Sequence, residues 1–340
     1  MKYRIAWMKG DGVGPEISDA AIEVLDSIQE RFSIKFDVIF YDLGDRSKVV
    51  RGSALPDDTI EGIKSSDAAI KGPVGESAFE SIVAVRQKLD LYANIRPARS
   101  YEGIPHVGKI DAIIVRENTE DLYKGIEFEV QGVATSLRII SEKATRRIAK
   151  VAAAYAMKRR KHVTVVHKAN VLRVSDGLFR RVALEELRNS DLMVDEKYVD
   201  AMSMALIRNP EQFDVILTPN VYGDILSDEA SQIAGGLGFA ASANIGDLNS
   251  LFEPVHGSAP DIAGKGVANP YSMVMSLSMM LNHIGIYKSD RKAIQASAVI
   301  SSVVEKSIKG GTLTPDAGGR LTTREVGREL AKGVREFVQT

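Results

Sequence analysis

The feature that most constrains the fold is an alternation of short apolar runs with segments of helical period. The runs have the length of buried strands, and we expect strands at 3–8, 36–41, 67–71, 111–115, 163–167 and 213–218. The other segments repeat apolar residues every three or four positions, which predicts helices at 14–32, 142–160, 176–189, 225–236, 271–286 and 292–307. This alternation predicts an α/β fold.

The chain is long enough for two domains. Its 340 residues exceed the size at which a single hydrophobic core usually stops growing. The sequence contains no internal repeat, no low-complexity segment and no linker rich in proline or glycine. Two domains without a linker suggest that the chain crosses between them more than once.

Composition and charge argue against several classes of protein. A formal net charge of −1 argues against a polyanion-binding protein. The one basic run, at 158–162, is interpreted as the solvated C-terminal end of a helix and not as a nucleic-acid patch. The absence of cysteine excludes disulfides, thiol catalysis and cysteine-ligated zinc, and it fits a soluble intracellular protein.

No segment of the sequence predicts export or a membrane span. The first twelve residues are too polar for a signal peptide, and we expect the first strand there. Residues 271–287 are apolar, but serine, asparagine and histidine interrupt them, so they predict a buried helix. We therefore expect a cytoplasmic protein with no nucleic-acid or membrane partner.

A glycine-rich turn, KGDGVGPE at 9–16, follows the first predicted strand and opens the first predicted helix. Its position suggests a dinucleotide-binding fingerprint, but the glycines at 10, 12 and 14 do not fit the G-x-G-x-x-G spacing. No acidic residue ends a second strand in the way that the fingerprint requires. We interpret the segment as a tight turn from strand to helix and not as a Rossmann nucleotide site.

Three arginines lie in apolar-rich segments, where an unpaired guanidinium is costly to bury. Arg86 lies in a helix-like stretch, Arg96 precedes Pro97 and is therefore extended, and Arg116 ends a strand. The planar guanidinium suits carboxylate or phosphate groups. Each arginine alone is also compatible with a structural ion pair, but together they suggest a small polyanionic substrate.

Two aspartates, Asp224 and Asp228, follow the strand predicted at 213–218 and stand four residues apart. If a helix begins there, both carboxylates lie on one face and repel each other. One interpretation is that the helix dipole favours acidic residues in the first turn. The other is a divalent cation, which removes the repulsion, and ligands that are all oxygen favour Mg²⁺ or Mn²⁺ over Zn²⁺.

Two further segments suggest catalytic and cofactor groups. Lys168 ends a predicted strand, and a metal and arginines nearby would lower its proton affinity, as a general base for an alcohol requires; a solvated loop lysine is the alternative. Residues 251–270 are too irregular for a regular element, and their small residues allow a flat ligand to approach the backbone. We interpret His256, beside Gly257 and Asp261, as an adenine and ribose contact.

In combination, these motifs resemble the β-decarboxylating dehydrogenases, a family that includes isocitrate, 3-isopropylmalate, homoisocitrate and tartrate dehydrogenases. The resemblance runs almost from end to end and is nearest to the archaeal 3-isopropylmalate dehydrogenases. The motifs that carry it are, in chain order, GDGVGPE, LDLYANIRP, VRENTEDLY, HKANVLR, YVDAMSMALI, NVYGDILSDEAS, EPVHGSAPDIAGKGVANP and TPDAGG.

The resemblance implies an isocitrate/isopropylmalate dehydrogenase-like fold, with two α/β domains over one continuous sheet, and not a Rossmann fold. The first, cofactor-binding domain would be discontinuous and comprise 1–98 plus 237–340. The second, which carries dimerisation, metal and substrate groups, would comprise 99–236. The active site would lie in the cleft between them and would be shared across a homodimer, alone or within a tetramer.

The resemblance also assigns roles by motif. Arg86, Arg96 and Arg116 resemble the arginines that hold the malate carboxylates of the substrate, and Tyr123 resembles the acid that protonates the enol.

Other assigned groups concern the metal and the cofactor. Lys168 and Asp200 resemble catalytic groups donated by a partner subunit, and Asp200, Asp224 and Asp228 resemble the ligands of Mg²⁺ or Mn²⁺. Asp261 stands where the family places a carboxylate on the adenosine ribose, which favours NAD over NADP. The predicted cofactor-binding residues are Glu253, His256, Gly257, Ser258, Ala259, Asp261 and Asn269.

Members of the family differ in the substrate group at the third carbon, which faces the turn before Arg86. Isocitrate enzymes tend to have serine and asparagine there, whereas this chain has Glu80 and Ile82, with Val83 beside it. An isopropyl group buried against Ile82 and Val83 would be stabilised by roughly 1–3 kcal/mol. A third carboxylate would be desolvated there and repelled by Glu80.

Two residues argue the other way, since Lys71 also appears in isocitrate enzymes and Phe79 stands where many isopropylmalate enzymes have glutamate. We expect NAD-dependent oxidative decarboxylation of 3-isopropylmalate to 4-methyl-2-oxopentanoate (2-oxoisocaproate) and CO₂, as in leucine biosynthesis. The alternatives are an isocitrate or homoisocitrate dehydrogenase and, from another class, a catalytically silent regulatory subunit. Such a subunit is expected to lack part of the tyrosine, lysine and aspartate set that this chain retains.

Overall fold

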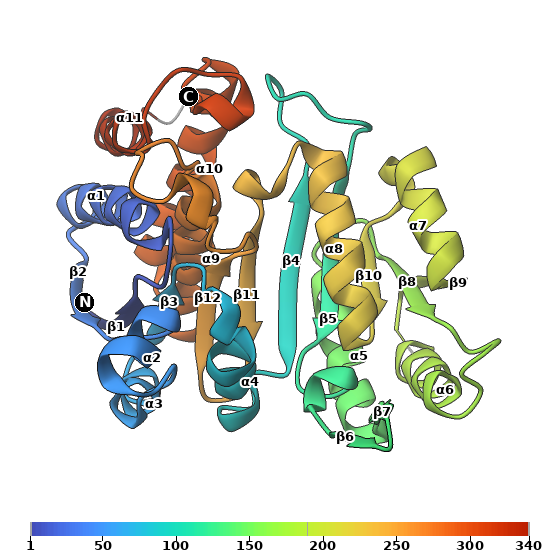
Figure 1. Cartoon of the computed structure of the whole chain (residues 1–340). Helices are drawn as coiled ribbons and strands as arrows, with labels where there is room; N and C mark the ends of the chain where they lie inside the picture. Colours follow the sequence, from blue (N-terminus) through green and yellow to red (C-terminus); the bar gives the residue numbers. More distant parts are fainter. Residues whose placement is uncertain (1, 189, 339–340) are drawn as a thin grey trace.

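The computed structural model describes residues 2–188 and 190–338. In these residues, ten strands form one mixed sheet in the order β2-β1-β3-β12-β11-β4-β5-β10-β8-β9, and β6 and β7 form a separate hairpin (Figure 1). The strands are β1 (Lys2–Met8), β2 (Lys35–Phe40), β3 (Ala68–Lys71), β4 (Ala93–Arg99), β5 (Asp111–Glu117), β6 (Glu127–Val130), β7 (Val133–Ser136), β8 (His162–His167), β9 (Met193–Tyr198), β10 (Val215–Thr218), β11 (Ala241–Ile245) and β12 (Ser250–Pro254).

Helices cover both faces of the sheet, with α4 and α8 in front of it and α5 and α9 behind it in Figure 1. One buried apolar cluster extends across the whole sheet, from Ile17 and Leu281 to Ile148 and Phe179. The helices are α1 (Gly14–Phe32), α2 (Asp45–Arg51), α3 (Asp57–Lys64), α4 (Ala84–Lys88), α5 (Glu142–Ala156), α6 (Ser175–Leu187), α7 (Val199–Arg208), α8 (Asn220–Ala234), α9 (Tyr271–Tyr287), α10 (Arg291–Lys309) and α11 (Thr323–Glu336).

The sheet has a seam where β4 pairs with β5 in antiparallel register. Strands from both ends of the chain, β2-β1-β3-β12-β11-β4, lie on one side of it, and β5-β10-β8-β9 lie on the other. The last-numbered strands, β11 and β12, therefore fill the middle of the sheet, between β3 and β4 (Figure 1). We retain the division into 1–98 plus 237–340 and 99–236 as a proposal.

The predicted α/β fold is confirmed, and the predicted strands and helices are present with shifted ends. The helix predicted from 225 begins at Asn220, directly after Pro219, so both predicted metal aspartates lie inside it. Helix α5 ends at Ala156, before the basic run, and Arg159 in that run donates a 2.7 Å hydrogen bond to the buried Asp214. The basic run therefore lies just beyond the helix end, where Lys158, Arg160 and Lys161 are exposed as predicted, and only Arg159 is drawn into a buried ion pair.

Several strands were not predicted, because their residues do not form apolar runs. Strand β4 contains Asn94, Arg96 and Pro97, and the edge strand β9 is largely polar. Residues 251–254 were predicted to be irregular, but they belong to β12, which is buried between β3 and β11. In contrast, the buried helix predicted at 271–287 is confirmed as α9, and no helix among the described residues is long and apolar enough to cross a membrane.

The glycine-rich turn at 9–16 joins β1 to α1, as predicted, and it connects three other loops. Gly12 has a φ of +57°, and a Cβ atom there would lie 1.9 Å from the carbonyl oxygen of Ser258. The Asp11 carboxylate accepts hydrogen bonds from the backbone N–H groups of Asp45, Arg46 and Gly75. The turn is therefore a structural junction at this end of the sheet.

Helix α8 lies close to β5 because residue 223 has no side chain. A Cβ atom on Gly223 would lie 2.5 Å from Cγ and 2.7 Å from Cβ of Arg116. Glycine at this position allows the helix to approach the strand closely, which brings the aspartates of α8 near Arg116.

We predict that Gly223→Ala lowers the free energy of unfolding by about 1–3 kcal/mol, because the added methyl group overlaps Arg116. Urea unfolding monitored by circular dichroism would measure the change. The matched control is Gly177→Ala in α6, where nothing lies within 4 Å of the added atom. There, alanine should stabilise the helix by about 0.5–1 kcal/mol. Equal stability of the two variants would contradict the packing argument.

Candidate active site

Arg116, near the end of β5, lies at the centre of the candidate site, and its side chain is buried. Its Nε donates to the backbone and side-chain oxygens of Asn220, each at 2.9 Å, and its Nη1 lies 2.5 Å from a carboxylate oxygen of Asp224. Burial and the neighbouring Arg96 lower the pKa of Arg116 to about 10. The guanidinium therefore remains charged at neutral pH.

Arg96, on the adjacent strand β4, binds both predicted metal aspartates. Its Nη1 lies 3.2 Å from one carboxylate oxygen of Asp224 and 3.2 Å from one of Asp228. The same nitrogen donates to Ser227 Oγ at 2.8 Å, and Nε donates to Asn94 Oδ1 at 2.7 Å. The antiparallel pairing of β4 with β5 thus places two arginines against one face of α8.

The two aspartates differ in the direction of their pKa shifts. Burial acts to raise the pKa of Asp224, but Arg116 and Arg96 outweigh it, so the pKa lies below its usual value. The pKa of Asp228 lies above its usual value, chiefly because the carboxyl is buried. Arg96 acts to lower this pKa but does not offset the effect of burial, and repulsion from Asp224 raises the pKa further. A cation bound beside Asp228 would favour its ionised form.

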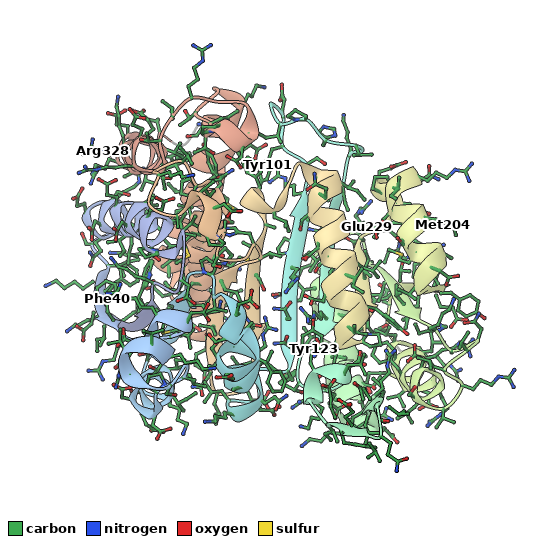
Figure 2. The ribbon with its side chains drawn as sticks, viewed as in Figure 1. Phe40, Tyr101, Tyr123, Met204, Glu229 and Arg328 are labelled. Carbon is green, nitrogen blue, oxygen red and sulfur yellow. The ribbon has the colours of Figure 1, made fainter. Side chains whose placement is uncertain are left out.

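Tyr123, in the short turn after β5, donates its hydroxyl hydrogen bond to the second carboxylate oxygen of Asp224. The guanidinium of Arg116 lies 4.9 Å from the centre of the Tyr123 ring. Burial, more than any neighbouring charge, raises the pKa of Tyr123, so the phenol is protonated at neutral pH. Figure 2 shows Tyr123 beside α8, between the two halves of the sheet.

Arg86, on α4, shares a buried carboxylate with Lys71. Glu253 accepts from Arg86 Nη2 at 2.9 Å and lies 2.7 Å from Lys71 Nζ, and Asn244 also donates to it at 2.7 Å. The side chains of Lys71, Arg86 and Glu253 are all less than 10% exposed. We call these three side chains the Lys71–Arg86–Glu253 triad. Its one carboxylate balances only one of its two positive charges.

Two guanidinium N–H groups remain unused in this cluster. Among the described residues, Arg86 Nε and Arg116 Nη2 are buried and have no hydrogen-bond partner. A buried donor without an acceptor is costly. The unsatisfied groups therefore fit the predicted role of these arginines in binding the carboxylates of a substrate.

The aspartates of α8 offer the carboxylate oxygens that Mg²⁺ and Mn²⁺ prefer. However, among residues 2–188 and 190–338, no group of three or more His, Cys, Asp or Glu side chains is placed to hold a metal ion. Asp224 and Asp228 therefore fit part of a divalent-metal site, which would need a further ligand.

Lys168 and Asp200 lie together, two strands away from β5. Lys168 follows β8, Asp200 begins α7, and their charged groups are 2.6 Å apart. This ion pair lowers the pKa of Asp200. No hydrogen bond or ion pair within the described chain joins either residue to Tyr123 or Asp224. Their predicted role requires that a second copy of the chain supplies them.

The predicted cofactor segment forms an exposed loop after β12. His256 contacts Gly257 O and Ser272 Oγ, each at 2.9 Å, and burial lowers its pKa, so it is neutral at pH 7. Asp261 is exposed, whereas Asn269 is buried and donates to Asp316 at 3.1 Å. The loop offers small side chains, a neutral imidazole and an exposed carboxylate, which fit a nucleotide, but these roles stay predictions.

Comparison with known proteins places the chain among characterised enzymes. Residues 4–330 match the isocitrate/isopropylmalate dehydrogenase family. This chain belongs to that family. It is 49% identical over 333 residues to a 3-isopropylmalate dehydrogenase from Sulfurisphaera tokodaii. The aligned region covers 97% of this chain and 98% of the relative.

Two further comparisons extend this result. The chain is 42% identical over 352 residues to a homoisocitrate dehydrogenase from Methanocaldococcus jannaschii, and the aligned region covers 98% of each protein. It also superposes on the structure of an isocitrate dehydrogenase from Methylococcus capsulatus with a TM-score of 0.91 and 39% identity, covering 98% of this chain and 100% of that one.

As a member of the isocitrate/isopropylmalate dehydrogenase family, the protein is a β-decarboxylating dehydrogenase. The predicted resemblance to archaeal 3-isopropylmalate dehydrogenases is confirmed, and so is the non-Rossmann fold.

In this dehydrogenase, the turn that we predicted to select the substrate is a π-helical turn, Phe79–Val83. Ile82 and Val83 are both buried, and Ile82 packs in a cluster with Val85 and Leu89. Glu80 is exposed and pairs with Lys48 at 2.8 Å. The roles of Ile82 and Val83 in substrate binding stay predictions.

Sequence reasoning missed the polar residues that hold these groups in place. Asn94, Asn118 and Asn244 form a buried hydrogen-bonded chain that leads from Arg96 to Glu253. The available signal was an asparagine inside each of the otherwise apolar runs YANI and ASANI. Glu253 was predicted to bind the cofactor, and here its carboxylate is engaged by Lys71 and Arg86.

We predict that Glu253→Gln lowers the free energy of unfolding at pH 7 by about 3 kcal/mol or more, because two buried cations lose their counter-charge. Burial acts to raise the pKa of Glu253, but Lys71 and Arg86 hold it well below its usual 4.5. This stabilisation is therefore complete above pH 4.5 and is lost as the pH falls below that value. Urea unfolding across this range should show the two proteins converging in acid.

The control is Glu80→Gln, the same change in an exposed pair with Lys48. Its effect should be within about 1 kcal/mol at every pH. If Glu253→Gln cost no more than Glu80→Gln, the Lys71–Arg86–Glu253 triad would not stabilise the fold.

Proposed function

We propose that the protein catalyses the NAD-dependent, divalent-metal-dependent oxidative decarboxylation of 3-isopropylmalate to 4-methyl-2-oxopentanoate and CO₂. One observation carries this proposal. Three buried arginines, two with an unused N–H group, surround a tyrosine and a pair of aspartates. This arrangement suits a small substrate with two carboxylates and a hydroxyl group.

The residues of the chain would bind the substrate and transfer protons. Arg86, Arg96 and Arg116 hold the carboxylates and orient the substrate. Lys168 from a second copy of the chain takes the hydroxyl proton. Tyr123, which remains protonated at neutral pH, returns a proton to the enol.

The aspartates and the loop after β12 would hold the two groups that complete the chemistry. Asp224 and Asp228, with Asp200 of a second copy, would bind Mg²⁺ or Mn²⁺, and the loop at 253–269 would bind NAD. When bound, the cation polarises the substrate oxygens and the nicotinamide accepts a hydride. The exposed Asp261 would accept hydrogen bonds from the ribose hydroxyls and repel a 2′-phosphate, which favours NAD over NADP.

The state of Lys71 supports 3-isopropylmalate over a tricarboxylate. Lys71 was the residue most able to pair with a third carboxylate, but it is buried and bound to Glu253 at 2.7 Å. The relative from Sulfurisphaera tokodaii, named as a 3-isopropylmalate dehydrogenase, agrees with this assignment, and the homoisocitrate dehydrogenase relative keeps that substrate as the alternative.

A homodimer is supported by exposed apolar groups near the distant catalytic pair. The β6–β7 hairpin is separate from the main sheet and exposes Phe128 and Val133. Met204 and Ile207 on α7 and Ile225 on α8 are also exposed, and Figure 2 shows Met204 on the outer side of its helix. A second copy that covers these surfaces would bury apolar area and bring Lys168 and Asp200 to the site.

We predict that kcat/KM for 3-isopropylmalate exceeds that for isocitrate and for homoisocitrate by about tenfold or more, because Lys71, the cation that could pair with a third carboxylate, is bound to Glu253. Assays with Mn²⁺ should also favour NAD⁺ over NADP⁺. Absorbance of the reduced cofactor measures both preferences. A tenfold preference for either tricarboxylate would contradict the substrate assignment while leaving the reaction class intact.

Controls in the same assay test the metal. EDTA should abolish turnover, and Asp224→Asn should give a folded protein whose turnover is lower by orders of magnitude. Full activity of the EDTA-treated enzyme would contradict the metal assignment.

The shared site predicts complementation between two inactive variants. Lys168→Ala and Tyr123→Phe chains should each be inactive, but a mixed dimer has one intact site. Random exchange of subunits should restore about one quarter of the wild-type activity, since half of the dimers are mixed and each has one working site. If mass spectrometry shows mixed dimers and no activity returns, the site is not shared.

A further inference from the structure

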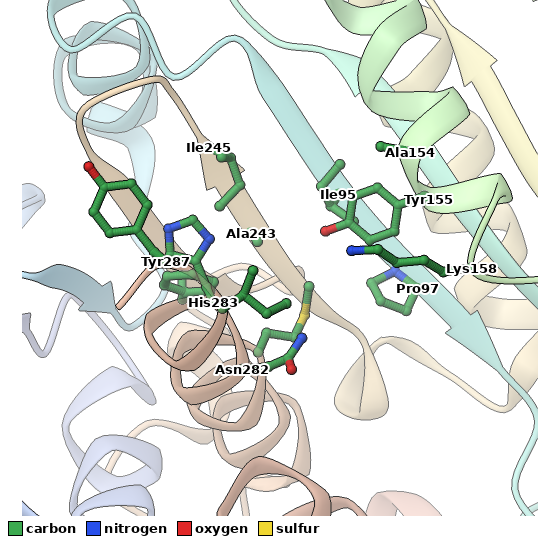
Figure 3. Close-up of a pocket in the computed structure, with 13 residues that line it drawn as sticks. Ile95, Pro97, Ala154, Tyr155, Lys158, Ala243, Ile245, Asn282, His283 and Tyr287 are labelled. Carbon is green, nitrogen blue, oxygen red and sulfur yellow. The ribbon is translucent and has the colours of Figure 1, made fainter. Parts of the chain in front are cut away.

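The sheet face opposite the arginine cluster carries a pocket. Side chains alternate between the two faces of a strand, so Ile95 and Pro97 of β4 point away from Asn94 and Arg96. Ile95 and Pro97, with Ala243 and Ile245 of β11, form the floor of a pocket of about 390 Å³ (Figure 3). That volume lies within the range of small-molecule sites.

Helices from both sides of the sheet seam form the walls of this pocket. Tyr155 of α5 and Lys158, just beyond the end of that helix, lie on one side. Asn282 and His283 of α9 lie on the other, as Figure 3 shows. A ligand in the pocket would therefore contact both halves of the sheet.

Four polar side chains line this apolar space: Tyr155 and His283 are half-buried, and Lys158 and Asn282 are exposed at its mouth. Within the described residues, no hydrogen bond or ion pair engages the Tyr155 hydroxyl, the Lys158 ammonium, the Asn282 amide or the His283 imidazole. Burial lowers the pKa of His283, so the imidazole is neutral at pH 7. None of the described residues that line the pocket is acidic, and the one charged group among them is the exposed ammonium of Lys158.

We propose that this pocket is a second, non-catalytic site for a small monocarboxylate with an aliphatic tail. The ammonium of Lys158 and the hydroxyl of Tyr155 would bind the carboxylate, as Figure 3 shows both polar ends directed toward the space above β4. The tail would pack on Ile95, Ala243 and Ile245. An amino acid fits poorly, because its ammonium would meet Lys158 and no carboxylate. The proposal is independent of the substrate of the catalytic site.

The experiment uses hexanoate as the probe and the full-length protein, with isothermal titration calorimetry as the readout. Wild type should show saturable binding in the millimolar range or tighter. Hexanamide and leucine should each bind about tenfold more weakly or worse, since one lacks the charge and the other adds a cation.

Variants locate the probe. Lys158→Met keeps the aliphatic stem but removes the charge, and Ala154→Phe fills the pocket from an exposed position on α5. Each should weaken hexanoate binding by about tenfold or more. Lys143→Met, an equivalent change of an exposed lysine elsewhere on α5, should leave binding unchanged. Thermal unfolding without the probe verifies that each variant is folded.

Three results would overturn the proposal. The first is an absence of saturable binding to wild type in the millimolar range. The second is equal binding of hexanoate and hexanamide. The third is binding that survives Lys158→Met and Ala154→Phe but is lost in Arg116→Gln, which would place the carboxylate at the catalytic arginines.

Discussion

Burying four cations on one side of a sheet is the constraint on which the rest of the structure depends. Lys71, Arg86, Arg96 and Arg116 all have nearly inaccessible side chains, and mutual repulsion would expel them without counter-charges. Glu253 serves the first pair, and the aspartates of α8 serve the second. The counter-charges come from β12 and α8, so the cluster assembles only when distant parts of the chain meet.

The balance of charge in this cluster favours the proposed anionic substrate. Among the described residues, the four buried cations pair with three carboxylates, those of Glu253, Asp224 and Asp228, so one positive charge is left unbalanced. The remaining positive potential and the unused guanidinium N–H groups are met best by a ligand with two carboxylates. A bound substrate would give partners to these unused groups, as expected of a preorganised binding site.

Much of the fold and of the site was predictable from the sequence, because strong periodicity and short motifs carry local information. The strands and helices with clear apolar patterns and the tight glycine turn follow from such patterns. The grouping of Arg96 and Arg116 with the α8 aspartates follows from the family resemblance and not from a local pattern. The asparagine chain and the pairing of Lys71 with Glu253 did not, because they join residues far apart in sequence whose partners no local pattern reveals. Strand β4 was not predicted for a related reason. Its polar residues face the site, and they interrupt the apolar run that would have indicated a strand.

The order of strands in the sheet has a consequence for synthesis on the ribosome. Strands β3 and β4 emerge early, but β11 and β12, which lie between them, are made only after the whole of the segment from β5 to α8. Until then, both early strands have an open edge, and open edges invite pairing with other chains. A nascent chain of this topology cannot complete its central sheet one domain at a time, so we expect its early segments to depend on chaperone protection more than those of a protein whose strands pair in the order of synthesis.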